Sequence, residues 1–158
     1  MSDIEVTTEI AADPGVVWRL VSDVTRMGQW SPETTSCRWL GDATGPAVGA
    51  KFKGSNKHGF RRWSTTCTVT AAEPGKSFAF DVHYGPLAIS TWDYRLENTP
   101  TGSTIVESWT DRRPSWMRAL SAPVMGVADR GAHNRRGMES TLAKLKAAAE
   151  SGRSAVSP

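Results

Sequence analysis

The stretch 124-VMGVADRGAHNRRGMESTLAKLKAAAE-150 decides the fold of this 158-residue chain. At about 3.6 residues per turn, one side of this stretch is largely apolar or small over about five turns. The residues on that side are Val127, Gly131, Asn134, Met138, Thr141, Leu142, Leu145 and Ala149. Charged residues such as Arg136 and Glu139 fall on the opposite side. The pattern predicts one long amphipathic helix that must lie on another layer of structure.

The segments before this helix follow the two-residue alternation of β-strands. The first predicted strand is 4–11, and the period of two returns at residue 34 and continues to residue 111. Short turns such as His58-Gly59 and Gly85-Pro86 separate the segments. Regular strands with short turns predict an antiparallel meander. Its predicted strands are 34–40, 51–57, 62–71, 78–82, 92–96 and 104–111.

Short helices are predicted in the sequence before residue 34 and after residue 111, flanking the run of strand segments. Asp13 at the N-cap and Pro14 at the first helical position predict a helix that ends near Asp23. A second short helix is predicted over 24–30, before Ser31-Pro32. Residues 115–122 predict a short helix or turn, which Pro123 separates from the long helix. The composition of 152–158 predicts a disordered tail.

Length and composition indicate one globular domain over residues 1–150, with residues 151–158 as the tail. The chain is 39% hydrophobic and 22% charged, and no run approaches the roughly 20 apolar residues that cross a bilayer. The first residues do not resemble a secretory signal, so a cytoplasmic location without stable membrane anchoring is expected. The net charge of +3 comes with scattered arginine pairs and no nucleic-acid motif. Nucleic-acid binding is therefore not expected.

Cysteine and histidine spacing predicts no metal site and no cofactor. Cys37 and Cys67 lie thirty residues apart and are expected to be small buried thiols. His58, His83 and His133 stand alone in the sequence, without the spacing of a metal motif.

Three regions share a recognisable pattern. The first is Asp13-Pro14 with 17-VWRLVSD-23 and 30-WSPE-33, the second runs from Trp63 through 67-CTV-69 to Glu73-Pro74, and the third is the long helix. Together they resemble the polyketide cyclase/dehydrase branch of the START/SRPBCC superfamily. The resemblance covers about residues 3–150. It implies an α+β helix-grip fold, in which a curved antiparallel sheet of six to seven strands wraps the C-terminal helix. It also implies two short helices after the first strand and an apolar cavity between sheet and helix.

Such a cavity would be lined by the inward face of the strands and by the helix stripe. For each strand tryptophan the alternative is ordinary core packing. For Asn134 the alternative is that it caps a loop or bonds to the sheet backbone. Gly131 is expected to leave room for a ligand or for a neighbouring tryptophan ring. The residues expected to contact a ligand are Trp63, Cys67, Phe80, Trp92, Tyr94, Glu107, Trp109, Trp116, Gly131, Asn134 and Met138.

The last strand leaves two orientations open. Ile105, Glu107 and Trp109 share one face, and Val106 lies on the other. If the larger apolar side chains face inward, Glu107 is buried and its pKa rises. If Val106 faces inward, Glu107 is a solvated strand residue.

Two functions fit these observations. The first is binding of a hydrophobic small molecule such as a lipid, a polyketide or an isoprenoid, by a monomer or a homodimer. The second is a polyketide aromatase/cyclase activity, which needs polar groups to move protons during aldol closure and dehydration. Glu107 and Tyr94 are the candidate catalytic residues. His83, Asp111 and Asn134 are further polar side chains of suitable type.

Overall fold

The alternating segments form a single antiparallel sheet. The computed structural model describes residues 2–117, 119 and 130–156, and within them the sheet has seven strands in the order β1-β7-β6-β5-β4-β3-β2. Their bounds are β1 Ile4–Ile10, β2 Thr34–Trp39, β3 Lys51–His58, β4 Arg61–Glu73, β5 Ser77–Tyr84, β6 Leu87–Thr99 and β7 Gly102–Asp111. The predicted meander is confirmed, and β1 is added next to its last strand.

Helical elements with described bounds flank the sheet strands in the sequence. They are α1 Pro14–Ser22, the 3-10 turn η1 Val24–Arg26, α2 Met27–Trp30 and α4 Arg130–Val156. Asp13 occupies the N-cap of α1, but its side chain makes no capping hydrogen bond. Asp23 caps η1 instead, by accepting a hydrogen bond from the Thr25 amide at 3.2 Å. The predicted start of α1, with Asp13 at the N-cap and Pro14 in the first turn, is therefore correct.

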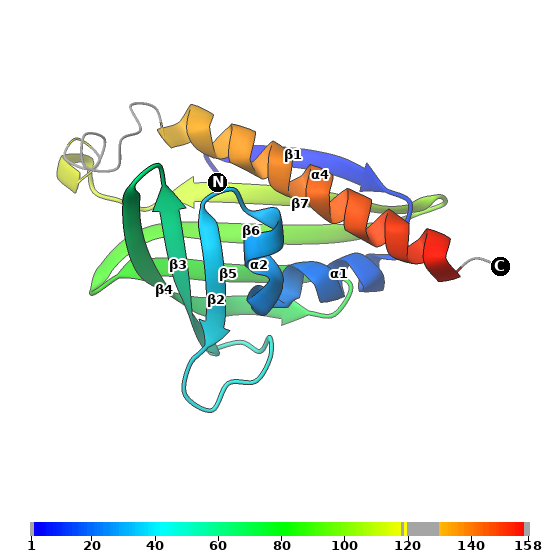
Figure 1. Cartoon of the computed structure of the whole chain (residues 1–158), viewed down its shortest axis with the longest axis horizontal. Coiled ribbons are helices and arrows are strands. Elements are labelled where there is room, and N and C mark those ends of the chain that lie inside the picture. Colours follow the sequence, from blue (N-terminus) through cyan, green and yellow to red (C-terminus); the bar gives the residue numbers. More distant parts are fainter. Residues whose placement is uncertain (1, 118, 120–129, 157–158) are drawn as a thin grey trace.

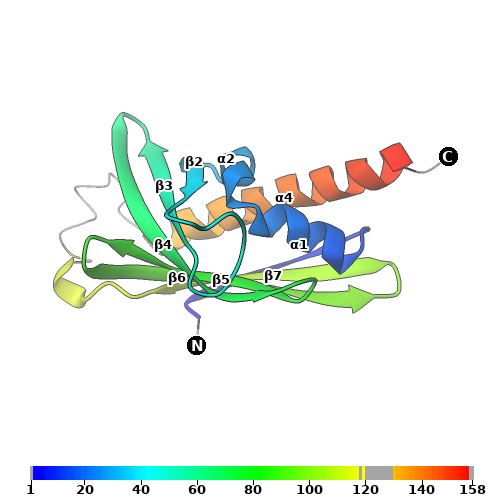
Figure 2. The same ribbon diagram turned by 90° about the horizontal axis from the view of Figure 1, so that it is seen from below.

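Helices α1, α2 and α4 lie on the same side of the sheet (Figures 1 and 2). Figure 2 shows the sheet curving upward through the β3–β4 hairpin, so that it partly encloses α4. A side chain at Gly28 would come within 2.4 Å of the Thr35 carbonyl oxygen. Only glycine therefore allows α2 to lie this close to β2. The curved sheet, the long C-terminal helix and the early short helices confirm the predicted helix-grip fold.

The stripe on α4 is buried as predicted from Met138 to Ala149. Leu142 and Leu145 pack with Val17 of α1 and with Phe78 and Ile105 of the sheet, and all five are fully buried. This end of the molecule is a solid core. Helix α4 continues to Val156, beyond the predicted end at Glu150 and into the segment predicted as a tail.

Part of the predicted connection between sheet and helix cannot be compared with the structure. Residues 115–117 and 119 are helical, as expected for the short segment after β7. Residues 118 and 120–129 lie outside the described residues, and they include Pro123, Val127 and the predicted start of the long helix at Val124. Within the described part of the chain, no helix combines the length and apolar character needed to cross a membrane.

Candidate functional site

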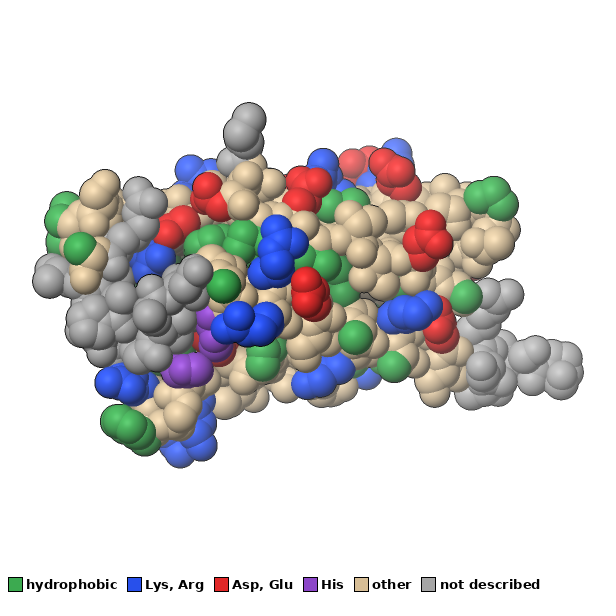
Figure 3. All heavy atoms as spheres, turned by 90° about the horizontal axis from the view of Figure 1, so that it is seen from above, with side chains coloured by type: hydrophobic (Ala, Val, Ile, Leu, Met, Phe, Trp, Pro, Cys, Tyr) green, Lys and Arg blue, Asp and Glu red, His purple; other side chains and the backbone are tan. Residues whose placement is uncertain are grey.

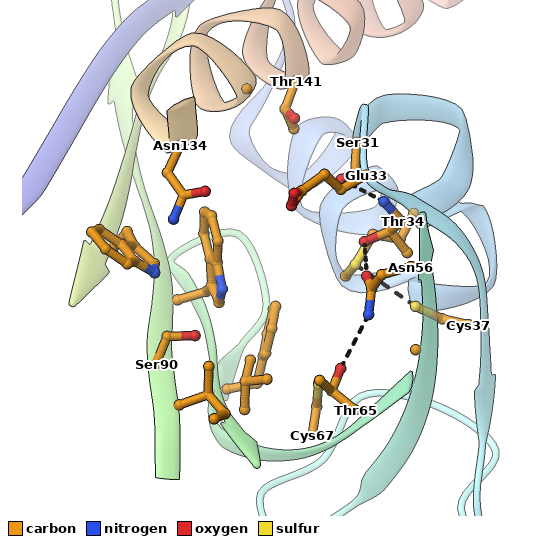
Figure 4. Close-up of a pocket in the computed structure, with 18 of the residues that line it drawn as sticks. Ser31, Glu33, Thr34, Cys37, Asn56, Thr65, Cys67, Ser90, Asn134 and Thr141 are labelled. Atoms are coloured by element: carbon orange, nitrogen blue, oxygen red, sulfur yellow. Dashed lines mark hydrogen bonds between the residues drawn. The ribbon is translucent and has the colours of Figure 1, made fainter. Parts of the chain in front are cut away.

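A cavity of about 630 Å³ separates the sheet from the first half of α4. Its size falls within the range of about 300–1,000 Å³ that is usual for small-molecule sites. Figure 4 shows Asn134 and Thr141 pointing into it from α4. Most of the side chains expected to contact a ligand line this cavity. They are Trp63, Cys67, Phe80, Trp92, Tyr94, Glu107, Trp109, Asn134 and Met138.

Two of the expected ligand residues are not among the cavity residues. Trp116 is 59% exposed and lies outside the cavity lining. Gly131 is also absent from the lining, and Gly137 lies there in its place. Gly137 is three residues after Asn134 and four before Thr141, so it shares their face of the helix. That spacing was a signal in the sequence which could have identified Gly137.

Aromatic rings supply much of the cavity wall. Trp92 on β6 and Trp109 on β7 are register partners, and their ring centroids are 6.5 Å apart. Phe52 on β3 and Phe80 on β5 meet edge to face at 5.1 Å. Such rings offer flat apolar surfaces that suit a hydrophobic ligand with a planar part.

Glu107 faces inward and is 1% exposed, because the alternation of β7 carries it in with Ile105 and Trp109. Its cross-strand neighbours are Tyr94 on β6 and Val6 on β1. The Tyr94 hydroxyl donates a hydrogen bond to Glu107 Oε1 at 2.8 Å. Among the described residues, Oε2 has no hydrogen-bond partner. The structure thus decides between the two orientations that the sequence left open.

Burial raises the pKa of Glu107 to about 8, although the hydrogen bond from Tyr94 acts in the opposite direction. The cause is desolvation, which disfavours the carboxylate relative to the neutral acid. Burial also raises the pKa of the Tyr94 hydroxyl, and the nearby Glu107 adds to this. Around neutral pH both groups are therefore mainly protonated.

A chain of polar side chains runs along another wall (Figure 4). Thr34 donates to Asn56 Oδ1 at 3.1 Å, and Asn56 Nδ2 donates to Thr65 at 3.4 Å. The Ser31 hydroxyl accepts from the Thr34 amide at 3.2 Å. No sequence motif reveals this row of side chains, because its members come from the loop before β2, from β2 itself, and from β3 and β4.

Other polar groups considered from the sequence are less suited to catalysis. Asp111 is held by Arg113, whose Nη2 lies 2.7 Å from Asp111 Oδ2, and this pairing neutralises its charge. His83 is not among the cavity residues. Burial raises the pKa of the Cys37 and Cys67 thiols, so neither is a ready nucleophile.

Sheet, helix and intervening cavity together define a helix-grip protein of the SRPBCC type. Residues 1–150 match the family model described as polyketide cyclase/dehydrase and lipid transport. The chain belongs to this family, whose fold binds hydrophobic ligands. A search of proteins with curated functions found no match.

Solved structures show the same architecture. The Polyketide_cyc-like protein Cgl2372 from Corynebacterium glutamicum is 32% identical, with a TM-score of 0.62 over 90% of this chain and 88% of that one. Protein NE0264 from Nitrosomonas europaea is 15% identical, with a TM-score of 0.69 over 97% of each chain. The di-domain ARO/CYC StfQ from the steffimycin biosynthetic pathway is 16% identical, with a TM-score of 0.72 over 97% of this chain and 51% of that one. The last two likenesses show the fold alone.

Proposed function

We propose that this protein binds a hydrophobic small molecule in the cavity between the sheet and α4. The observation that carries the proposal is a cavity of about 630 Å³ with aromatic walls and a few separate polar groups. A packed core of this size would contain no such space, because protein interiors leave few voids larger than a water molecule. Lipids, polyketides and isoprenoids are the ligand classes that fit a site of this kind.

The wall chemistry favours a ligand with fused rings over a simple acyl chain. Trp92, Trp109 and Phe80 offer ring faces, whereas Asn56 and Asn134 offer hydrogen-bonding amides well apart from one another. A polycyclic polyketide with oxygen substituents matches both features. An unbranched fatty acid would use the apolar walls but could offer only its carboxylate to the polar groups of the lining.

Direct binding tests this proposal. Tryptophan fluorescence is titrated with emodin (a trihydroxyanthraquinone), farnesol and palmitate as representatives of the three classes. We expect saturable binding, with emodin at least about tenfold tighter than palmitate, which corresponds to about 1.4 kcal/mol. Absence of saturable binding for all three compounds would contradict the proposal.

Two tryptophan variants locate the bound molecule. Trp92→Ala removes a cavity wall and is expected to weaken emodin binding at least about fivefold. Trp116→Ala is the matched control, because that ring is exposed and lies outside the cavity lining. If Trp116→Ala weakened binding and Trp92→Ala did not, the ligand would lie elsewhere.

Glu107 favours an aldol cyclase/dehydratase as the second candidate function. A carboxyl with a pKa of about 8 is suited to exchange protons near neutral pH. As a carboxylate it would take a proton from the carbon between two carbonyls, and the resulting enolate would attack a distant carbonyl of the same chain. The new alkoxide would then recover that proton, and loss of water would follow.

The burial of Glu107 favours ligand binding over catalysis as the function of the cavity. With 1% of its surface exposed, the carboxyl meets a substrate atom only after neighbouring side chains move. The enzyme hypothesis is tested with a synthetic poly-β-ketone and absorbance detection of the aromatic product. It predicts turnover that rises through about pH 8 and is lost in Glu107→Gln. Equal product formation with and without protein would exclude it.

A further inference from the structure

Three possible metal ligands from distant parts of the sequence meet at the cavity. Glu33 lies between α2 and β2, His58 ends β3, and His133 lies near the start of α4. All three are half-buried, and their ligand atoms lie within 4.8 Å of one another. Glu33 and His133 line the cavity. Histidine side chains also gather at one place on the face shown in Figure 3.

The spacing within this cluster is close to that of a zinc site. His133 Nε2 lies 3.2 Å from Glu33 Oε2. In a tetrahedral zinc site with bonds of about 2.0–2.1 Å, neighbouring ligand atoms are about 3.4 Å apart. The rings of His58 and His133 are 4.9 Å apart and nearly perpendicular, at 85°. A modest rotation of the His58 side chain would complete a set of three ligands.

Backbone contacts hold the three ligands in place. The Lys57 amide donates to the Glu33 carbonyl at 2.8 Å, which fixes Glu33 beside the end of β3. A Cβ atom on Gly137 would lie 3.4 Å from the Pro32 ring, so α4 packs closely against Pro32, the residue before Glu33. His133 is one turn before Gly137 and is therefore held above the same loop. Ligands placed in advance in this way are what a metal site requires.

A simple ion pair between His133 and Glu33 is the alternative explanation. It accounts for two of the residues but gives no reason for a second imidazole at the same place. Arg61, the register partner of His58, has its guanidinium 4.9 Å from the centre of the Phe60 ring. That stacking engages one of the positive charges of the hairpin that carries His58.

We propose that Glu33, His58 and His133 bind a divalent transition-metal ion, with zinc as the preferred ion, at the edge of the cavity. Two imidazoles and one carboxylate form the ligand set of zinc sites that keep a coordination position open. Such a position could take water or an oxygen atom of a molecule in the cavity. The sequence predicted no metal site, because gaps of 25 and 75 residues between these positions form no motif.

Metal titration of the full-length protein tests the proposal. After treatment with EDTA and its removal, ZnCl₂ is added in a calorimeter. We expect one zinc per chain with a dissociation constant of about 1 μM or below. His58→Ala and Glu33→Gln should each weaken binding at least about tenfold. His83→Ala is the matched control and should leave binding unchanged, because His83 is not part of the cluster.

Cobalt(II) distinguishes this site from binding by the thiols of Cys37 and Cys67. Nitrogen and oxygen ligands give visible d–d bands without the thiolate charge-transfer band that cysteine ligands produce. Zinc binding weaker than about 100 μM, or binding that His58→Ala does not affect, would overturn the proposal. Circular dichroism checks that each variant is folded. Emodin binding by the EDTA-treated protein is measured separately, so failure of the metal site and failure of the proposed function are distinguishable.

Discussion

The two halves of α4 meet very different surroundings. From Leu142 onward the helix lies on a solid core with α1 and the sheet, where Phe78, Ile105 and Leu145 are fully buried. Before that point the same stripe borders a cavity, whose lining includes Asn134 and Gly137. One amphipathic stripe can thus serve both stability and binding. What changes along it is the size and polarity of the side chains rather than its periodicity.

The first prediction compares two aromatic truncations. Phe78→Ala removes a fully buried ring from the solid half and should lower the free energy of unfolding by about 3–5 kcal/mol. Trp92→Ala removes a cavity wall, where one side of the ring has no packing partner, and should cost less than about 2 kcal/mol. Urea denaturation measures both. Equal losses would mean that the two halves are packed alike.

The second prediction concerns pH and Glu107, a carboxyl buried beside the cavity. Glu107 has a pKa of about 8 in the folded protein, against 4.5 as its usual value. The folded state therefore keeps a proton that the unfolded state loses between these values. The stability that Glu107 contributes is fully present below about pH 4.5 and is lost as pH rises to about 8. At about 1.4 kcal/mol for each pKa unit, the difference between 4.5 and about 8 corresponds to a loss of roughly 5 kcal/mol.

Glu107→Gln isolates this effect from other titrating groups. The variant cannot ionise, so its free energy of unfolding should fall less than that of the parent protein between pH 5 and pH 9. Urea denaturation at the two pH values gives the comparison. Identical changes in both proteins would show that Glu107 is not desolvated as the structure indicates.

The smallest predicted effect is a gain in folding stability from a substitution in the half of α4 that borders the cavity. At Gly137 a new Cβ would lie 3.4 Å from Pro32, in ordinary van der Waals contact. Alanine also favours the helix, so Gly137→Ala should stabilise the protein by about 0.5–1 kcal/mol. The control is Gly28→Ala, whose Cβ would overlap the Thr35 backbone and should destabilise the protein. A loss of stability in Gly137→Ala would mean that the cavity edge is as tightly packed as the contact between α2 and β2.

Periodicity accounts for what could be predicted from the sequence. Strand alternation and the stripe on α4 locate the sheet, the buried helix face and most of the cavity wall, because those features depend only on which face each residue occupies. Trp63, Trp92 and Trp109 all line the cavity, and their contact with a ligand stays a prediction.

Features that depend on distances between elements could not be predicted in this way. Trp116 is of a residue type that often contacts ligands, but its segment lies past the end of β7 and leaves the ring exposed. The hydrogen bond between Tyr94 and Glu107 requires the register of β6 against β7, which alternation alone does not give. The cluster of Glu33, His58 and His133 requires three elements to meet at one place.

The position of β1 beside β7 has a consequence for the order of folding. Strands β2 to β7 pair with their sequence neighbours, whereas Thr7 pairs with Val106, about a hundred residues later. Bringing such distant segments together costs the most loop entropy, so β1 is expected to join the sheet last. During synthesis on the ribosome it must wait until β7 has been made. Because Val6 of β1 lies beside Glu107, the arrival of β1 also completes the burial of that carboxyl. Retention of the Glu107 proton at neutral pH would therefore mark the final step of folding.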